Sequence, residues 1–171
     1  MAITKVSEFG DTAAAATGRM GGTYSSWYSP NNARYEDGFY CYTIYSGVVS
    51  RITVGFYWGG ALRYELTGSI LAKDGSYKWD AGTSPTTLPT YDQINNSGFG
   101  VGCYFSQNGV NKTNDLWVSN FGFSIPDETI VSLKAFFKYK YTSTYIYVDA
   151  IKVVVEYGSE SKTRNFCVMI G

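Results

Sequence analysis

The segment 130–157 constrains the fold most, because it contains two long runs in which apolar and polar residues alternate. The apolar members of the first run are Val131, Leu133, Ala135, Phe137, Tyr139 and Tyr141, and those of the second are Ile151, Val153, Val155 and Tyr157. Successive side chains of a strand point to opposite faces, so each run has one apolar and one polar face. A short polar link at residues 142–144 separates the runs. The pattern predicts an antiparallel hairpin at the centre of a half-buried sheet.

Two apolar residues stand on the polar face of this hairpin. Phe136 and Val154 occupy positions that alternation assigns to solvent, among Lys134, Lys138 and Lys152. Contiguous apolar surface of this kind is typical of a contact site. We therefore expect this face to be partly covered, by the N-terminal arm or by a neighbouring subunit.

Shorter alternating runs predict further strands. They lie at residues 39–45, 49–58, 62–70, 77–79, 99–105 and 165–170. Gly59 and Gly60 join the runs at 49–58 and 62–70 as a tight hairpin turn. In the run at 62–70, alternation predicts that Leu66 points inward. Turn signals recur about every 8–12 residues, which is the pattern of sandwiches. The sequence predicts an all-β, antiparallel, jelly-roll-like β-sandwich of roughly eight to ten short strands, with no helix.

The chain has the length of one domain. Residues 1–26 are rich in small residues and glycine, and we interpret them as an N-terminal arm that precedes a single β-sandwich domain over residues 27–171. Residues 80–98 form the longest stretch without alternation, which predicts a functional loop or a segment that covers a sheet edge.

The charges are balanced, with 14 Lys and Arg against 14 Asp and Glu. A neutral chain creates no long-range field that attracts nucleic acid or an anionic membrane, so neither is an expected partner. The sequence shows no apolar run of signal-peptide or membrane-spanning length, which predicts a protein assembled in the cytoplasm.

The inventory of reactive residues argues against catalysis. The chain has no histidine, which removes the Ser-His-Asp and Cys-His nucleophiles and the commonest metal ligand. Cys41, Cys103 and Cys167 are scattered through apolar segments, which predicts buried free cysteines; the alternative is one disulfide with a thiol left over. The acids Asp127, Glu128 and Glu156 are weak candidates for a carboxylate pair. We expect neither an enzyme nor a cofactor.

Asp149 is a separate case, because it lies between apolar residues of a strand. A buried carboxylate needs a backbone or cationic partner, so we interpret it as a structural anchor. The alternative is a calcium ligand.

Aromatic residues are unusually frequent, with 16 Tyr, 10 Phe and 4 Trp. A core of this size cannot hold so many rings, and exposed tyrosines are typical of protein interfaces and of sugar-binding surfaces. Trp58 has a core position. The candidates for interface contacts or glycan stacking are Tyr77, Trp79, Tyr91, Trp117, Phe136 and Val154.

Several sequence blocks resemble a group of β-sandwich proteins of tailed phages, prophages and bacterial genomes, mostly virion or uncharacterised surface proteins. The blocks cover about a third of the chain and lie at residues 27–33 with 37–40, 98–101, 119–126 with 129–130, and 148–157. They contain no catalytic motif. The resemblance implies a virion setting and a sandwich fold, and it assigns no active-site residue.

We therefore hypothesise a non-enzymatic phage virion component, either a capsid decoration (cement) protein or a tail or fibre accessory protein. It would contact copies of itself and other virion proteins through Tyr-rich faces. The alternative is a carbohydrate-binding module that recognises surface glycans with exposed Trp and Tyr rings.

Overall fold

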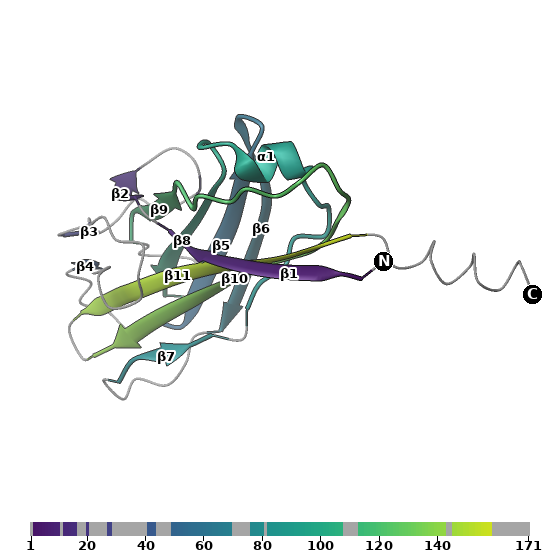
Figure 1. Cartoon of the computed structure of the whole chain (residues 1–171). Coiled ribbons are helices and arrows are strands. Elements are labelled where there is room, and N and C mark those ends of the chain that lie inside the picture. Colours follow the sequence, from purple (N-terminus) through teal and green to yellow (C-terminus); the bar gives the residue numbers. More distant parts are fainter. Residues whose placement is uncertain are drawn as a thin grey trace, which may run out of the picture.

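The computed structural model describes residues 2–10, 12–16, 20, 27–28, 41–43, 49–69, 76–80, 82–107, 113–142 and 145–158. These residues form two antiparallel sheets, consistent with a β-sandwich (Figure 1). In Figure 1 the long strands of one sheet run across those of the other. The predicted all-β class is confirmed.

The first sheet, sheet A, has six strands in the order β3-β4-β11-β10-β7, and β1 also pairs with β11. Its members are β1 (Thr4–Phe9), β3 (Trp27–Tyr28), β4 (Cys41–Thr43), β7 (Lys78–Trp79), β10 (Ile130–Tyr141) and β11 (Ile146–Tyr157). Strands β10 and β11 form the hairpin that the alternation predicts. Strands β1 and β4 share the other edge of β11, and β7 pairs with the other edge of β10.

The second sheet, sheet B, has five strands in the order β2-β9-β8-β5-β6. Its members are β2 (Thr12–Ala16), β5 (Arg51–Trp58), β6 (Ala61–Ser69), β8 (Gly100–Ser106) and β9 (Asp115–Ser119). The turn between β5 and β6 has positive φ at Gly59 (62°) and Gly60 (80°), which glycine adopts without steric strain. The strands predicted at 49–58 and 99–105 are confirmed, and Trp58 is buried as expected.

Two register shifts in the β10–β11 ladder change which side chains face the core. The first lies between Ile130 and Ser132, so that Ile130 is buried and Val131 is 42% exposed. The inward position predicted for Val131 is therefore wrong, because a bulge breaks simple alternation. The second shift lies between Lys138 and Tyr139 and makes Asp149 the extra residue of a bulge on β11, and as a result both Ala150 and Ile151 are buried.

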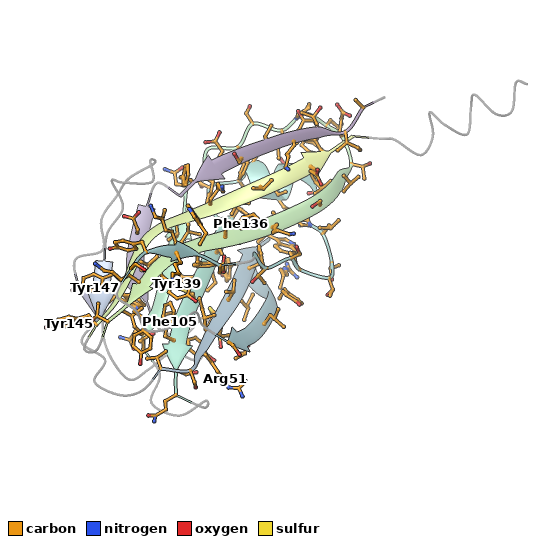
Figure 2. All side chains as sticks on the ribbon, turned by 90° about the horizontal axis from the view of Figure 1, so that it is seen from below. Arg51, Phe105, Phe136, Tyr139, Tyr145 and Tyr147 are labelled. Atoms are coloured by element: carbon orange, nitrogen blue, oxygen red, sulfur yellow. The ribbon has the colours of Figure 1, made fainter. Side chains whose placement is uncertain are left out.

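Side chains of both sheets meet in one aromatic-rich core. Phe105 of β8 and Tyr139 of β10 make an edge-on contact with ring centroids 5.4 Å apart, and Figure 2 shows both between the sheets. Trp27 packs on Phe105 at 6.0 Å, and its Nε1 donates a hydrogen bond to the Asn114 carbonyl oxygen at 2.6 Å. Cys103 is buried in this core, as predicted, whereas Cys167 lies outside the described residues and Cys41 belongs to β4.

The N-terminal segment that the sequence suggests as an arm contains two strands. Strand β1 pairs with β11 over Thr4 to Phe9, and β2 pairs with β9 in the other sheet. Gly10 lies between them, where its amide donates to the Ile151 carbonyl oxygen (3.1 Å) and a β-carbon would collide with Val118. The segment therefore connects the two sheets at one point of very close packing.

Strand β6 forms the edge of sheet B, and it is more exposed than its alternation predicts. Leu66 is 48% exposed, so its predicted inward orientation is wrong. An edge strand has a neighbour on one side only, and less of the facing sheet covers it. Tyr64 still packs against the core and lies 6.4 Å from the Phe56 ring.

The predicted loop at 80–98 contains one short helix, α1 (Tyr91–Asn95), so the expectation of no helix is wrong there. Thr90 caps it, since its side-chain oxygen accepts a hydrogen bond from the Gln93 amide and the Gln93 side chain accepts one from the Thr90 amide. The Asn95 side chain bonds both the amide and the carbonyl oxygen of Ile125 at 2.8 Å. The helix thereby closes one end of the sandwich over buried Ile94.

The outer side of sheet B is also buried in part. The Trp117 ring lies against the backbone of Gly102 and makes an edge-on contact with Tyr57 at 5.8 Å. Met20 lies 3.0 Å from the position of a β-carbon at Gly55, and its amide donates to Asp115 Oδ2 at 2.8 Å. The middle strand β8 is therefore buried on both faces. The strand predicted at 165–170 and most of that at 39–45 lie outside the described residues.

Replacing Gly102 by alanine tests the packing of Trp117. The new methyl carbon would lie 2.7 Å from Trp117 Cδ2 and 2.8 Å from two more ring atoms, so the ring must shift. We expect the free energy of unfolding to fall by about 1–3 kcal/mol, measured by urea denaturation. Gly68→Ala is the matched control on β6, because nothing lies within 4 Å of that position. Equal stability of the two variants would contradict the packing described for Trp117.

Candidate binding surface

The outer face of sheet A combines lysines with aromatic rings. We call it the lysine–aromatic face, and it consists of Phe9, Tyr77, Trp79, Lys134, Phe136, Lys138, Lys140, Tyr147 and Lys152. The alternation that sends the apolar residues of β10 and β11 inward places these residues on the other side.

The strand registers place lysines beside rings. Lys152 of β11 lies opposite Phe9 on one side and Phe136 on the other, while Lys138 lies opposite Trp79. Directly opposed side chains on one face of a sheet have β-carbons about 4.5–5.5 Å apart, so each ring lies within reach of an ammonium group.

Four lysines of this face lie over rings. The Lys152 ammonium is 5.0 Å from the Trp79 ring centroid and 5.4 Å from that of Phe136, and Lys134 lies 6.0 Å from Phe136. Lys138 lies 5.9 Å from the Tyr77 centroid. Such contacts contribute about 0.5–1 kcal/mol each at exposed sites, so they orient the ammonium groups without removing them from solvent.

Lys140 lies between two tyrosines at the turn end of the hairpin. Its ammonium is 4.6 Å from the Tyr77 centroid and 4.4 Å from that of Tyr147. Tyr145 makes an edge-on contact with Tyr147 at 6.0 Å, and Figure 2 shows both at this end of the molecule. We call Tyr77, Tyr145 and Tyr147 the tyrosine cluster; all three are half-buried.

Asp149 forms an ion pair with Lys138, whose ammonium lies 3.3 Å from its Oδ2. The carboxylate stands at the β11 register shift and has the cationic partner that the anchor interpretation requires. Within the described residues, no three acidic or cysteine side chains gather in a group that suits a metal ion. The ion pair therefore favours the anchor over the calcium alternative.

A groove lies over the half of this face nearer the start of β10. It has a volume of about 450 Å³ and is lined by Lys5, Val6, Ser7, Ser132, Lys134, Phe136, Lys152, Val154 and Glu156. We call it the Phe136 groove. It is formed by three neighbouring strands, β1, β11 and β10.

Phe136 and Val154, the two apolar residues expected to be covered, are both half-buried. Gly82 covers one edge of Phe136, because a β-carbon at position 82 would lie 2.7 Å from Phe136 Cε2 and 2.8 Å from Lys134 Cδ. Gly82 has φ of 92°, which side chains other than glycine rarely adopt. Strand β1 flanks Val154, which lies opposite Ser7. The N-terminal segment thus lies beside this face as a strand.

The structure gathers four of the six predicted site residues on one face. Tyr77, Trp79, Phe136 and Val154 lie on the outer side of sheet A. Trp117 is 5% exposed in sheet B, so its ring has no face available to stack on a sugar.

Tyr91 lies elsewhere, at the helical end of the sandwich. It lines a second hollow of about 440 Å³ with Leu88, Asp127 and Glu128. Both acids are exposed.

The sequence interpretation missed Phe9 and the role of the lysines. Phe9 lies 6.4 Å from Trp79, although the two are far apart in the chain. The lysines were visible as the polar half of the alternation in residues 134–140, where each is next to an aromatic or apolar residue. That signal can identify the surface, but only the register of β1 and β7 shows which rings stand beside which ammonium groups.

Asp80 holds the edge of β10 beside this face. Its amide donates to the Phe137 carbonyl oxygen (3.0 Å), and its Oδ1 accepts from the Phe137 amide (2.9 Å). Burial raises the pKa of the Asp80 carboxyl to about 6, against the smaller opposing effect of hydrogen bonds from the backbone at Phe137, Gly82 and Asp80 itself. The carboxyl also lines a small cleft of about 220 Å³ between the sheet edges, with Ile52, Val54 and Leu66 among its neighbours.

Comparisons with known proteins found no relative of this chain. No protein-family model matches it, and no curated protein or solved structure matches it either. None of the helices in the described residues is long and apolar enough to cross a membrane. The assignment of a function therefore depends on the surface chemistry described above.

Asp80→Asn tests the cost of burying this carboxylate. The folded pKa is higher than the unfolded value of about 3.8, so the native state binds more protons between about pH 4 and 6 and the Asp80 contribution to stability is lost as pH rises through 6. The asparagine amide oxygen still accepts from Phe137 and carries no charge. We expect the stability advantage of the variant over the wild type to be larger at pH 8 than at pH 4.5 by roughly 1–3 kcal/mol in urea denaturation.

The quantity to compare is the difference in the free energy of unfolding between Asp80→Asn and the wild type, because the other carboxylates are the same in both proteins. A constant difference from pH 4.5 to pH 8 would show that Asp80 is not destabilised by burial.

Proposed function

We propose that the protein is a non-enzymatic structural component of a phage virion, either a capsid decoration protein or a tail or fibre accessory protein. The observation that supports a contact function most directly is the tyrosine cluster beside Lys140 at the turn end of the β10–β11 hairpin. The virion setting rests on the resemblance of the sequence blocks at 27–33 with 37–40, 98–101, 119–126 with 129–130, and 148–157.

The tyrosine cluster has the chemistry of an interface. Tyrosine offers a large rigid ring with only two rotatable side-chain torsions, so ordering it on contact costs little entropy. The backbone of Tyr145 is held in place, because the Tyr145 amide donates to Thr142 Oγ1 (2.9 Å) and the Thr142 amide donates to the Tyr145 carbonyl oxygen (2.9 Å). Holding Tyr145 before contact reduces the cost of binding further.

Repeated weak contacts suit a protein that is present in many copies. Formal charges sum to zero, so like copies do not repel one another over long distances. Several interfaces of modest strength on one particle give high overall avidity. The partners under this proposal are copies of the chain itself and other virion proteins.

The double variant Tyr145→Ala/Tyr147→Ala tests the contact function. We expect loss of the rings to weaken self-association, and co-sedimentation with the particle that carries the protein, by about ten-fold or more. Sedimentation velocity over a range of concentrations measures the first and particle pelleting the second. Val131→Ala is the control, since Val131 is exposed on the same hairpin and lies away from the cluster. A wild-type chain that stays monomeric and never pellets with particles would refute the proposal.

Carbohydrate binding is the second candidate function, and the position of Trp79 favours it. Trp79 is half-buried on the short edge strand β7, beside Phe9 and the Lys152 ammonium. An indole ring on an accessible face can stack on a sugar ring. The two functions are compatible, because tail fibres contact surface glycans.

Trp79→Ala separates the two candidates. If the protein binds glycans through this face, the variant loses binding on a glycan array while self-association is unchanged. Tyr91→Ala is the comparison variant, because Tyr91 lines the hollow at the helical end and is expected to leave glycan binding intact. Unchanged glycan binding by Trp79→Ala would remove Trp79 as the stacking residue.

A further inference from the structure

We propose that the Phe136 groove binds an acidic saccharide, a sugar that carries a carboxylate. This inference rests on the carbohydrate-binding candidate above and names its ligand class and its site. The site lies in the groove beside Trp79, and Trp117 and Tyr91 lie outside it.

The lining of the groove carries more positive than negative charge. It includes the ammonium groups of Lys5, Lys134 and Lys152 against the single carboxylate of Glu156. Within the part of the chain that the structure describes, neither Lys134 nor Lys152 has a carboxylate at ion-pair distance, whereas Lys138 outside the groove is paired with Asp149. The groove therefore has an excess of positive charge that an anionic ligand would complement.

The groove also contains apolar surface. Phe136 and Val154 line the groove, and Lys134 and Lys152 hold their ammonium groups 6.0 and 5.4 Å from the Phe136 ring centroid. The apolar C–H face of a pyranose can pack on such a ring while its carboxylate reaches either ammonium. The ring and the charges are fixed relative to each other by the cross-strand position of Lys152 opposite Phe136.

The groove presents both hydrogen-bond donors and hydrogen-bond acceptors. Ser7 and Ser132 supply hydroxyls, and Glu156 supplies an acceptor in the same groove. A ligand that suits all of them must carry an anionic group for lysine and hydroxyl donors for Glu156. An acidic sugar has both, whereas a fully ionised polyphosphate would meet the Glu156 carboxylate without a donor to offer it.

The backbone of the groove also disfavours a peptide ligand. Strand β11 is hydrogen-bonded to β1 on one side and to β10 on the other, and the groove lies across the face of these three strands. A peptide lying in the groove would therefore contact side chains and would not add a strand to the sheet. The balanced total charge likewise gives no long-range attraction for nucleic acid.

The size is compatible with a short saccharide. The groove volume of about 450 Å³ lies within the usual range for small-molecule sites, roughly 300–1,000 Å³. One or two sugar rings fill such a space, so a longer acidic polymer would place successive residues along the face towards Trp79 and Lys138.

Isothermal titration calorimetry with defined probes tests the proposal. We expect oligomers of galacturonate or of sialic acid to bind the full chain, and the corresponding methyl esters, which lack the charge, to bind about ten-fold more weakly or worse. Affinity for the acid form should fall when sodium chloride is raised from 50 to 300 mM, while any binding of the ester should not change.

Single substitutions assign the binding to the groove. Lys134→Gln and Lys152→Gln should each weaken binding of the acid form by about five- to ten-fold and leave the ester unaffected. Phe136→Ala should weaken both forms by about five-fold. Arg51→Gln is the charge-matched control: Arg51 is exposed in sheet B, and Figure 2 shows it far from Phe136. Circular dichroism on each variant verifies that it is folded.

Four outcomes would overturn the inference. Equal affinity for the acid and the ester would show that the groove binds sugars without regard to charge. The carbohydrate-binding candidate would then stand, and the acidic-saccharide inference would be wrong. Tighter binding of polyglutamate or polyphosphate than of the acidic oligomers would indicate a general polyanion surface. Equal losses in Arg51→Gln and the groove variants would place the ligand elsewhere. No binding of either acidic oligomer would reject the site, while the particle-binding test of the tyrosine cluster stands independently.

Discussion

The antiparallel ladder between β10 and β11 is the interaction on which sheet A depends. Each of these two strands has 12 residues. The strands β1, β4 and β7 pair with the outer edges of this hairpin, and β3 joins the sheet by pairing with β4. Strands β1 and β4 occupy consecutive stretches of the β11 edge, and β7 with the Thr83 bridge occupies the edge of β10. Short strands of two or three residues cannot persist alone, so their positions are consequences of this hairpin.

The same ladder produces both the core and the lysine–aromatic face. Inward residues such as Phe137 and Tyr139 pack against sheet B, and the residues between them appear on the other side as lysines and rings. Stability and surface chemistry are therefore encoded in alternate positions of one segment. A change at Lys134 or Lys152 alters the surface with little effect on the core, whereas a change at Phe137 acts on the core directly.

Much of the fold was predictable because the strands are amphipathic. Alternation identified β5, β8 and the β10–β11 hairpin, with residues such as Ile52 and Phe105 on the correct face. It failed at Val131, where a bulge shifts the phase, since a bulge depends on the partner strand and leaves no periodic signal. It also failed at Leu66, because alternation cannot tell an edge strand from a central one. For the surface, the sequence marked Phe136, Val154, Tyr77 and Trp79, but Phe9 joins them through a pairing between the two ends of the described chain.

That pairing also determines the order in which the fold can be completed. Strand β1 is synthesised first, yet its partner is the 152–157 half of β11, at the far end of the described chain. During synthesis on the ribosome, β1 cannot pair with β11 until all five described strands of sheet B have been synthesised. Contacts of such long sequence separation close late and slow folding. Closure of the lysine–aromatic face, to which β1 contributes Phe9, is therefore expected to be a late step of folding, because this surface cannot form before β11 has been synthesised.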